Sequence, residues 1–181
     1  MTQQVLFIQG GGDAGYEEDA QLVASLQTEL GAVYQVHYPR LPSDKALPDF
    51  GWLQQISDEI TGIRGNVILV GHSLGASMLL KFLSEKQVKK KITGIFLLST
   101  PFWSGDEKWM EGLTLKEDFA HKLPGNVPLF FYHCRDDEVV SFENLALYGQ
   151  KLPHAALRPI NSGGHQLNNN LFLVATDIKS L

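Results

Sequence analysis

Residues 66–83, NVILVGHSLGASMLLKFL, decide the fold of this 181-residue chain. The apolar run at 66–70 predicts a buried strand, and the apolar spacing over 74–86 predicts an amphipathic helix. Between them lies GHSLG, a G-x-S-x-G pattern in which the chain turns directly from strand to helix. Side chains two positions either side of Ser73 would collide in so tight a turn, which explains both glycines.

This turn makes Ser73 a candidate nucleophile. Its hydroxyl would stand clear of the sheet at the start of a helix, where unpaired backbone N–H groups face a developing negative charge. The N–H of Leu74 is the first predicted oxyanion donor. The alternative interpretation is a serine that only caps a helix in a glycine-rich turn. His72 is expected to point away from the nucleophile and to be structural.

Outward from this stretch, short apolar runs alternate with segments of helical periodicity. The pattern predicts an α/β fold: a three-layer α/β/α sandwich with six parallel strands and right-handed crossovers. Strands are predicted at 5–9, 33–38, 66–70, 92–99, 128–134 and 156–160, and helices at 17–30, 49–61, 74–86, 142–151 and 168–181. With 44% hydrophobic residues, residues 1–181 are expected to form one domain. Residues 101–124 are either a small cap beside the site or an ordinary crossover helix.

Composition limits the partners. A net charge of -5 provides no positive field for a nucleic acid. Cys134 is the only cysteine, so no internal disulfide can form and no Cys/His cluster suggests zinc. No apolar stretch reaches the roughly 20 residues of a membrane span, and the N-terminus has no basic region. A cytoplasmic protein without nucleic-acid or membrane partners is therefore expected, and its oligomeric state is left open.

A second oxyanion donor is expected from the loop after the first strand, Gln9-Gly10-Gly11-Gly12-Asp13. Successive glycines let the backbone approach a substrate closely, and Gly11 is the preferred donor, with Gly12 next. A dinucleotide site is the competing interpretation. It is weaker, because the loop lacks the G-x-G-x-x-G spacing and no acidic residue ends the second strand.

A serine needs an imidazole to accept its proton and a carboxylate to orient that imidazole. Only His165 among the six histidines lies in a loop directly after the last strand, at the edge where ligands of open α/β sheets bind. Asp136 and Asp137 follow another strand end. Asp137 is preferred, because an aspartate followed one residue later by two apolar residues is typical of such acid loops. Asp136 and Glu138 are then interpreted as solvated turn residues.

The glycine-rich loop, GHSLG, RDDEVV and GGHQL occur in that order and resemble the α/β-hydrolase superfamily over essentially the whole chain. Within it, the short length, the segment YPRLP at 38–42 and Trp52 resemble small serine hydrolases of the retinoblastoma-binding protein 9 and YdeN group. The resemblance implies an enzyme that cleaves a carboxylic ester or related acyl compound through an acyl-serine intermediate, carboxylesterase-like, with a small-molecule acyl substrate and no metal or organic cofactor. An acyltransferase on the same site, or a catalytically weak binding protein, are the alternatives.

Overall fold

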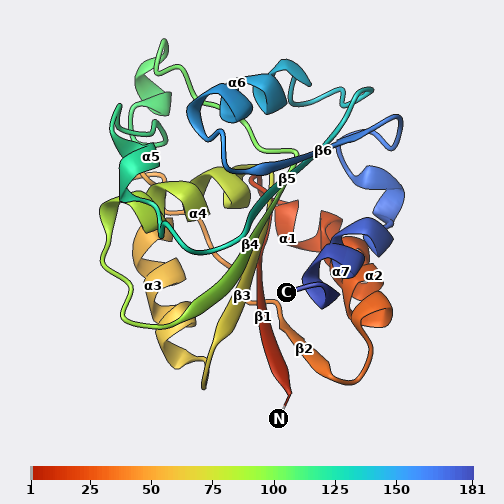
Figure 1. The fold of residues 1–181 in the computed structure, drawn as a ribbon. Helices are drawn as coiled ribbons and strands as arrows, with labels where there is room; N and C mark the ends of the chain where they lie inside the picture. The colour runs from red at the N-terminus through yellow and green to blue at the C-terminus, as the bar shows by residue number, and fades with distance from the viewer. Residues whose placement is uncertain (1) are drawn as a thin grey trace.

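The apolar runs of the sequence become the strands of one parallel sheet. In the computed structural model, which describes residues 2–181, the strand order is β2-β1-β3-β4-β5-β6 (Figure 1). The strands are β1 (Gln3–Ile8), β2 (Tyr34–His37), β3 (Val67–His72), β4 (Ile92–Leu98), β5 (Leu129–Cys134) and β6 (Ala156–Ile160). The predicted fold class, a six-stranded parallel α/β sheet, is confirmed.

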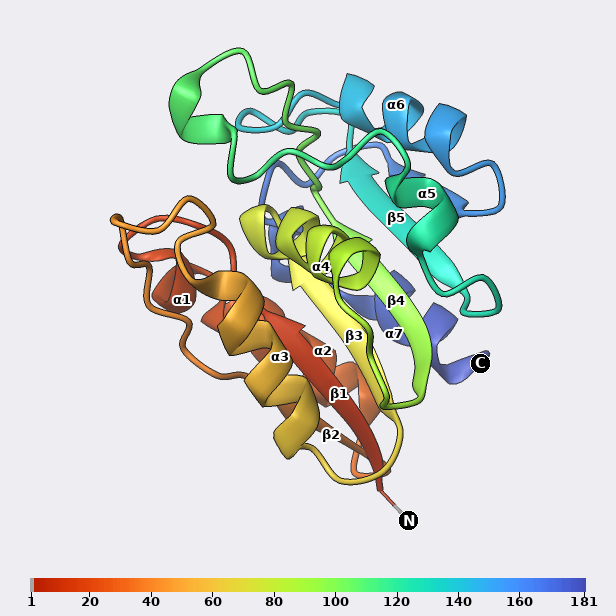
Figure 2. The ribbon, with the colours of Figure 1, turned by 90° about the vertical axis from the view of Figure 1, so that its left-hand side faces the viewer.

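Helices cover both faces of the sheet. They are α1 (Gly15–Glu18), α2 (Ala20–Leu30), α3 (Trp52–Gly62), α4 (Leu74–Glu85), α5 (Phe119–Lys122), α6 (Glu143–Lys151) and α7 (Phe172–Lys179), with short 3₁₀ turns η1 (Lys108–Met110) and η2 (Leu167–Asn169). Figure 2 shows α3 and α4 in front of the sheet and α2 and α7 behind it. Each layer of helices therefore buries one face of the strands.

Alternate strand residues feed two separate cores, because successive side chains of a strand point to opposite faces. In β1, Leu6 and Ile8 join the cluster formed with α3, α4 and α6, whereas Val5 and Phe7 join the cluster formed with α2 and α7. All four are fully buried. Coverage on both sides explains why the strands read as continuous apolar runs instead of alternating ones.

Two predicted helices differ from the observed ones. The helix expected over 17–30 is divided into α1 and α2, and Asp19 is the residue between them. The side chain of Asp19 is buried in the interior. The last helix begins at Phe172, not at residue 168, because Leu167, Asn168 and Asn169 adopt left-handed backbone conformations with φ of 50–51°. Asparagine tolerates that conformation better than most residues, so the polar run could have signalled a turn.

The carboxyl ends of all six strands meet at one edge of the sheet, since the strands are parallel. The loops after β1, β3, β5 and β6 lie there, and residues 101–113 pass over the same edge (Figure 2). Within 101–124 the only regular elements are η1 and α5, and α5 packs on α4. None of the helices within residues 2–181 has the length and apolarity needed to cross a membrane.

One ion pair joins α7 to the edge of the sheet and gives a test of stability. The Asp177 carboxylate accepts hydrogen bonds from Arg158 Nε at 3.0 Å and from the Tyr132 hydroxyl at 2.7 Å. Burial raises the pKa of Asp177, but these two partners outweigh burial and leave the pKa below its ordinary value. The stabilisation is therefore present above the unfolded-state pKa of about 4 and is lost as the pH falls through the folded-state pKa.

We expect Asp177→Asn to lower the free energy of unfolding at neutral pH by about 1 to 2 kcal/mol, because Arg158 is more than one-third exposed and screened by water. Urea unfolding of both proteins at neutral pH and at successively lower pH measures the difference. The difference in the free energy of unfolding between wild type and Asp177→Asn should narrow below about pH 4, because the wild-type carboxylate then becomes protonated. A difference that stays constant with pH would contradict this account.

Candidate active site

Ser73 lies at the sharp junction between β3 and α4. Its backbone has φ 51° and ψ -122°, a conformation that costs a non-glycine residue about 1–3 kcal/mol. The two flanking glycines are required sterically. A Cβ on Gly71 would lie 2.8 Å from Ala76 Cα, and one on Gly75 would lie 2.2 Å from the carbonyl oxygen of Gln9. The strand–turn–helix expected from GHSLG is thus present, with its serine in a strained conformation.

The backbone N–H groups expected to hold an oxyanion lie around this serine. Gly11, Gly12 and Leu74 line the same cavity as Ser73, and a Cβ on Gly11 would lie 2.8 Å from Leu74 Cδ2. Among residues 2–181, no hydrogen bond joins the N–H of Leu74, Gly11 or Gly12 to an acceptor. The Gly10 N–H, by contrast, donates to Asp19. Three N–H groups at this position are therefore free to bind a ligand oxygen.

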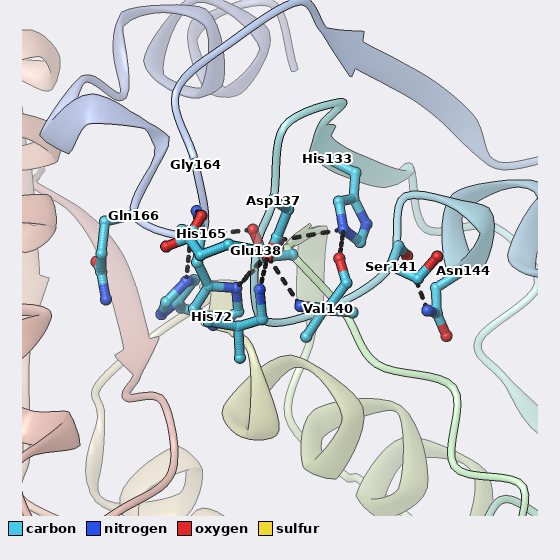
Figure 3. A network of polar contacts seen from close by, with 12 residues as sticks. His72, His133, Asp137, Glu138, Val140, Ser141, Asn144, Gly164, His165 and Gln166 are labelled. Atoms are coloured by element: carbon cyan, nitrogen blue, oxygen red, sulfur yellow. Dashed lines mark hydrogen bonds and ion pairs between the residues drawn. The ribbon is translucent and has the colours of Figure 1, made fainter.

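His165 and Asp137 are in direct contact. Nδ1 of His165 lies 3.0 Å from both Oδ1 and Oδ2 of Asp137 (Figure 3). The Asp137 side chain is fully buried, and His165 is buried except for one edge that lines the cavity. The structure thus brings Asp137, rather than Asp136, against the imidazole. This contact fixes the proton of the neutral ring on Nδ1 and leaves Nε2 as the acceptor.

Asp137 has further partners. Its Oδ1 accepts hydrogen bonds from the N–H groups of Val139 and Val140, and its Oδ2 lies 3.2 Å from Nε2 of His133. Burial alone raises the pKa of the Asp137 carboxyl. The hydrogen bonds from the two histidines and the two N–H groups more than offset burial and hold that pKa well below its ordinary range. Asp137 is therefore a carboxylate at any pH near neutrality.

Asp136 and Glu138, the two acids beside Asp137, also accept backbone hydrogen bonds. Asp136 and Glu138 were expected to be solvated turn residues, and both are exposed. However, Asp136 accepts hydrogen bonds from the N–H groups of Gly163 and Gly164, each at 2.9 Å. Glu138 accepts one from the N–H of His165 at 3.2 Å. Residues 135–140, the acid loop, therefore hold residues 162–166, the histidine loop, by their backbone N–H groups. No local pattern in the sequence predicts these contacts.

Ser73 and His165 line the same cavity, but no hydrogen bond joins the Ser73 hydroxyl to His165 among residues 2–181. Catalytic hydrogen bonds of this kind are commonly long before a substrate binds. The histidine–aspartate half of the predicted triad is thus joined by hydrogen bonds, and the serine half is only brought to the same cavity.

The cavity measures about 590 Å³ and is mostly apolar. Its apolar walls come from Phe50, from the segment 101–113 and from Val139 and Val140. Glu18 is the only charged residue of its lining, and no lysine or arginine contributes within the part of the chain described. An adjoining hollow, which shares His165, is lined by three glutamates, Glu17, Glu18 and Glu138. Over residues 2–181, the cavity and the hollow are therefore lined by carboxylates and by no lysine or arginine.

No group of three or more His, Cys, Asp or Glu side chains within residues 2–181 is arranged to hold a metal ion.

His72, which the sequence predicts to be structural, is buried next to His165, and the centroids of the two rings lie 4.8 Å apart.

Known proteins resemble this chain in sequence and in fold. The sequence model of the serine hydrolase family matches residues 21–172. YdeN of Bacillus subtilis (strain 168), described as a hydrolase, is 28% identical over 128 residues, which are 67% of this chain and 64%, slightly under two thirds, of YdeN.

Solved structures share the fold. The crystal structure of YdeN superposes with a TM-score of 0.70 at 22% identity, covering 99% of this chain and 98% of YdeN. Est1E from Butyrivibrio proteoclasticus gives 0.69 at 17% identity, covering 99% of this chain and 86% of Est1E. The esterase domain of a Rhodothermus marinus protein gives 0.70 at 15% identity, with 98% and 84% covered. At these identities the structural likeness concerns the fold alone.

Proposed function

The chain belongs to the serine hydrolase family, and from this premise we propose that it hydrolyses carboxylic esters through an acyl-serine intermediate. In this proposal Ser73 is the nucleophile, His165 the general base and Asp137 the acid that orients it. The contact of both Asp137 oxygens with His165 Nδ1, on an imidazole that shares a cavity with Ser73, is the observation that carries the proposal. No metal or organic cofactor has a step in it.

The proposed reaction has two halves. Ser73 Oγ forms a bond to the acyl carbon while its proton passes to His165 Nε2, and the carbonyl electron pair moves onto the oxygen. The N–H groups of Leu74 and Gly11 stabilise that oxyanion. The carbonyl re-forms, the bond to the leaving oxygen breaks, and His165 returns its proton to the alcohol. A water molecule, deprotonated by His165 Nε2, then attacks the acyl carbon. The bond between that carbon and Ser73 Oγ breaks, His165 returns the proton to Oγ, and the acid is released.

The cavity lining supports an uncharged, apolar acyl group as the substrate. Residues 101–113, with Phe102, Trp103 and Trp109, place aromatic side chains beside Ser73, and in this proposal they act as a small cap over the acyl group. A carboxylate on the acyl chain would lose its hydration against these walls without meeting a cation. The glutamates of the adjoining hollow would repel it further.

We therefore expect p-nitrophenyl butyrate to be hydrolysed with a kcat/KM at least about tenfold higher than the monoester of p-nitrophenol with succinate, a difference of about 1.4 kcal/mol in transition-state binding. Steady-state release of p-nitrophenol measures both. Equal values would contradict an apolar acyl site.

A second experiment distinguishes hydrolysis from acyl transfer. An alcohol or an amine is added to the reaction and the acyl products are identified, and hydrolysis predicts the free acid as the main product.

A further inference from the structure

A second histidine–carboxylate pair lies directly beneath the proposed triad. His72 Nδ1 is 2.9 Å from Oδ1 and 3.0 Å from Oδ2 of Asp19, and each residue is only 1% exposed. Burying a carboxylate is expensive unless its lone pairs accept hydrogen bonds. The remaining polar atoms of this buried pair therefore need hydrogen-bond partners of their own.

The Asp19 carboxylate contacts both loops that frame the cavity. Its Oδ2 accepts a hydrogen bond from the Gly10 N–H at 2.7 Å, in the oxyanion loop, residues 9–13, which also carries Gly11. Its Oδ1 accepts one from Gln166 Nε2 at 3.1 Å, in the loop that carries His165. Asp19 is able to make these contacts because the helix is broken there between α1 and α2. One buried carboxylate thus connects the oxyanion loop with the histidine loop.

His72 contacts the main chain of the proposed base itself. Its Nε2 lies 2.9 Å from the carbonyl oxygen of His165 (Figure 3). The Ser99 hydroxyl, fully buried, donates to the same oxygen at 3.1 Å. The backbone of His165 is therefore held at its carbonyl by two buried donors and at its N–H by Glu138.

The hydrogen-bonding partners assign the protons of the pair. A carbonyl oxygen only accepts, so Nε2 of His72 carries a proton. Burial raises the pKa of Asp19, but its contacts with His72, the Gly10 N–H and Gln166 outweigh burial and leave the pKa below its ordinary value. Nδ1 of His72 faces this carboxylate and Nε2 faces the His165 carbonyl, so both ring nitrogens of His72 lie against acceptor oxygens.

We propose that Asp19 and His72 are positioning residues that hold the oxyanion loop and the backbone of His165 at the spacing that catalysis requires. This inference rests on the proposed function. The pair touches no reacting atom, but a misplacement of about 1 Å at a catalytic group can cost about 10²-fold in rate. Because the pair acts on the placement of His165 and Gly11, its loss should lower kcat much more than it changes KM.

Two substitutions separate the two ends of the imidazole. The carboxamide N–H of H72Q reaches the position of Nε2 and keeps the contact with the His165 carbonyl. That of H72N reaches the position of Nδ1 and keeps only the contact with Asp19. We expect H72N to lower kcat for p-nitrophenyl butyrate about 10- to 100-fold with KM changed less than about threefold, and H72Q to recover most of that loss. H37N, a histidine substitution at the end of β2, is the matched control and should keep the wild-type kcat.

Circular dichroism and thermal unfolding establish that each variant is folded. If H72N does not fold, D19N makes the same test, because it keeps an oxygen for the Gly10 N–H but removes the charge that His72 requires. A folded H72N or D19N with the wild-type kcat would overturn the inference. Equal losses in H72N and H72Q would also overturn it, since the damage would then not follow the contact with His165.

The wild-type protein distinguishes this failure from failure of the proposed function. If it hydrolyses p-nitrophenyl butyrate and is labelled by a fluorophosphonate, an unimpaired H72N contradicts the positioning role alone. If the wild type shows neither turnover nor labelling, the proposed function fails, and the inference that rests on it fails with it.

Discussion

Ser73→Ala is expected to lower kcat for p-nitrophenyl butyrate by about 10⁵- to 10⁶-fold, to the level left by oxyanion binding alone. The hydroxyl is the only group of the proposed mechanism that forms a bond to the acyl carbon, and His165 has no other proton to accept from the enzyme. Alanine removes only the hydroxyl oxygen and keeps the Cβ of Ser73, whose φ is 51°. Turnover and covalent labelling by a fluorophosphonate, located by mass spectrometry of the peptide containing residue 73, measure the effect.

The matched control is Ser84→Ala, near the far end of the same helix, α4. Ser84 is buried, and its hydroxyl donates only to the Lys81 carbonyl. This variant should keep both the turnover and the labelling of the wild type. Undiminished labelling of Ser73→Ala would remove Ser73 as the nucleophile, and labelling of the wild type without turnover of any short ester would favour a binding protein that has lost its activity.

Asp137→Asn is expected to lower kcat by about 10⁴-fold while the protein stays folded. A carboxamide at this position can turn an N–H toward His165 Nδ1, which stabilises the tautomer that cannot accept the serine proton. The N–H groups of Val139 and Val140 favour this arrangement, because they claim the remaining amide oxygen. The pH dependence of kcat/KM, measured for both proteins, shows whether the activity that remains still needs a neutral imidazole.

Asp136→Asn is the control that separates the two neighbouring aspartates. Its amide oxygen can still accept from Gly163 and Gly164, so only the charge is removed, and we expect a loss of less than about tenfold. A loss in Asp136→Asn as large as that in Asp137→Asn would contradict the assignment of Asp137. Because the pKa of Asp137 lies well below neutrality, a loss of activity in Asp136→Asn cannot come from protonation of Asp137.

The sequence predicted those features that follow from local rules. The sheet and its parallel sense follow from short apolar runs between helical segments, and the conformation of Ser73 follows from the two glycines around it. His165 and Asp137 could be placed at one edge of the sheet because every parallel strand ends there. The structure places both side chains at that edge and joins them at 3.0 Å.

Long-range contacts could not be predicted in the same way. The segment EEDAQLVASLQTEL consists of helix-forming residues on both sides of Asp19, so nothing local indicates the break between α1 and α2. The break depends on contacts with Gly10 and His72, which are 9 and 53 positions away. The hydrogen bonds that Asp136 and Glu138 accept from the histidine loop, 27 positions away, are likewise long-range contacts that no local rule predicts.

The conformation of Ser73 has a consequence for how such a protein can change over time. Its left-handed backbone suits glycine better than serine, so the side chain that we propose as the nucleophile also makes the fold less stable. Under this proposal, a serine-to-glycine exchange would gain folding free energy as it abolished acyl chemistry. Relatives that are relieved of selection for turnover have a thermodynamically downhill route to becoming inert scaffolds with an intact, apolar ligand cavity.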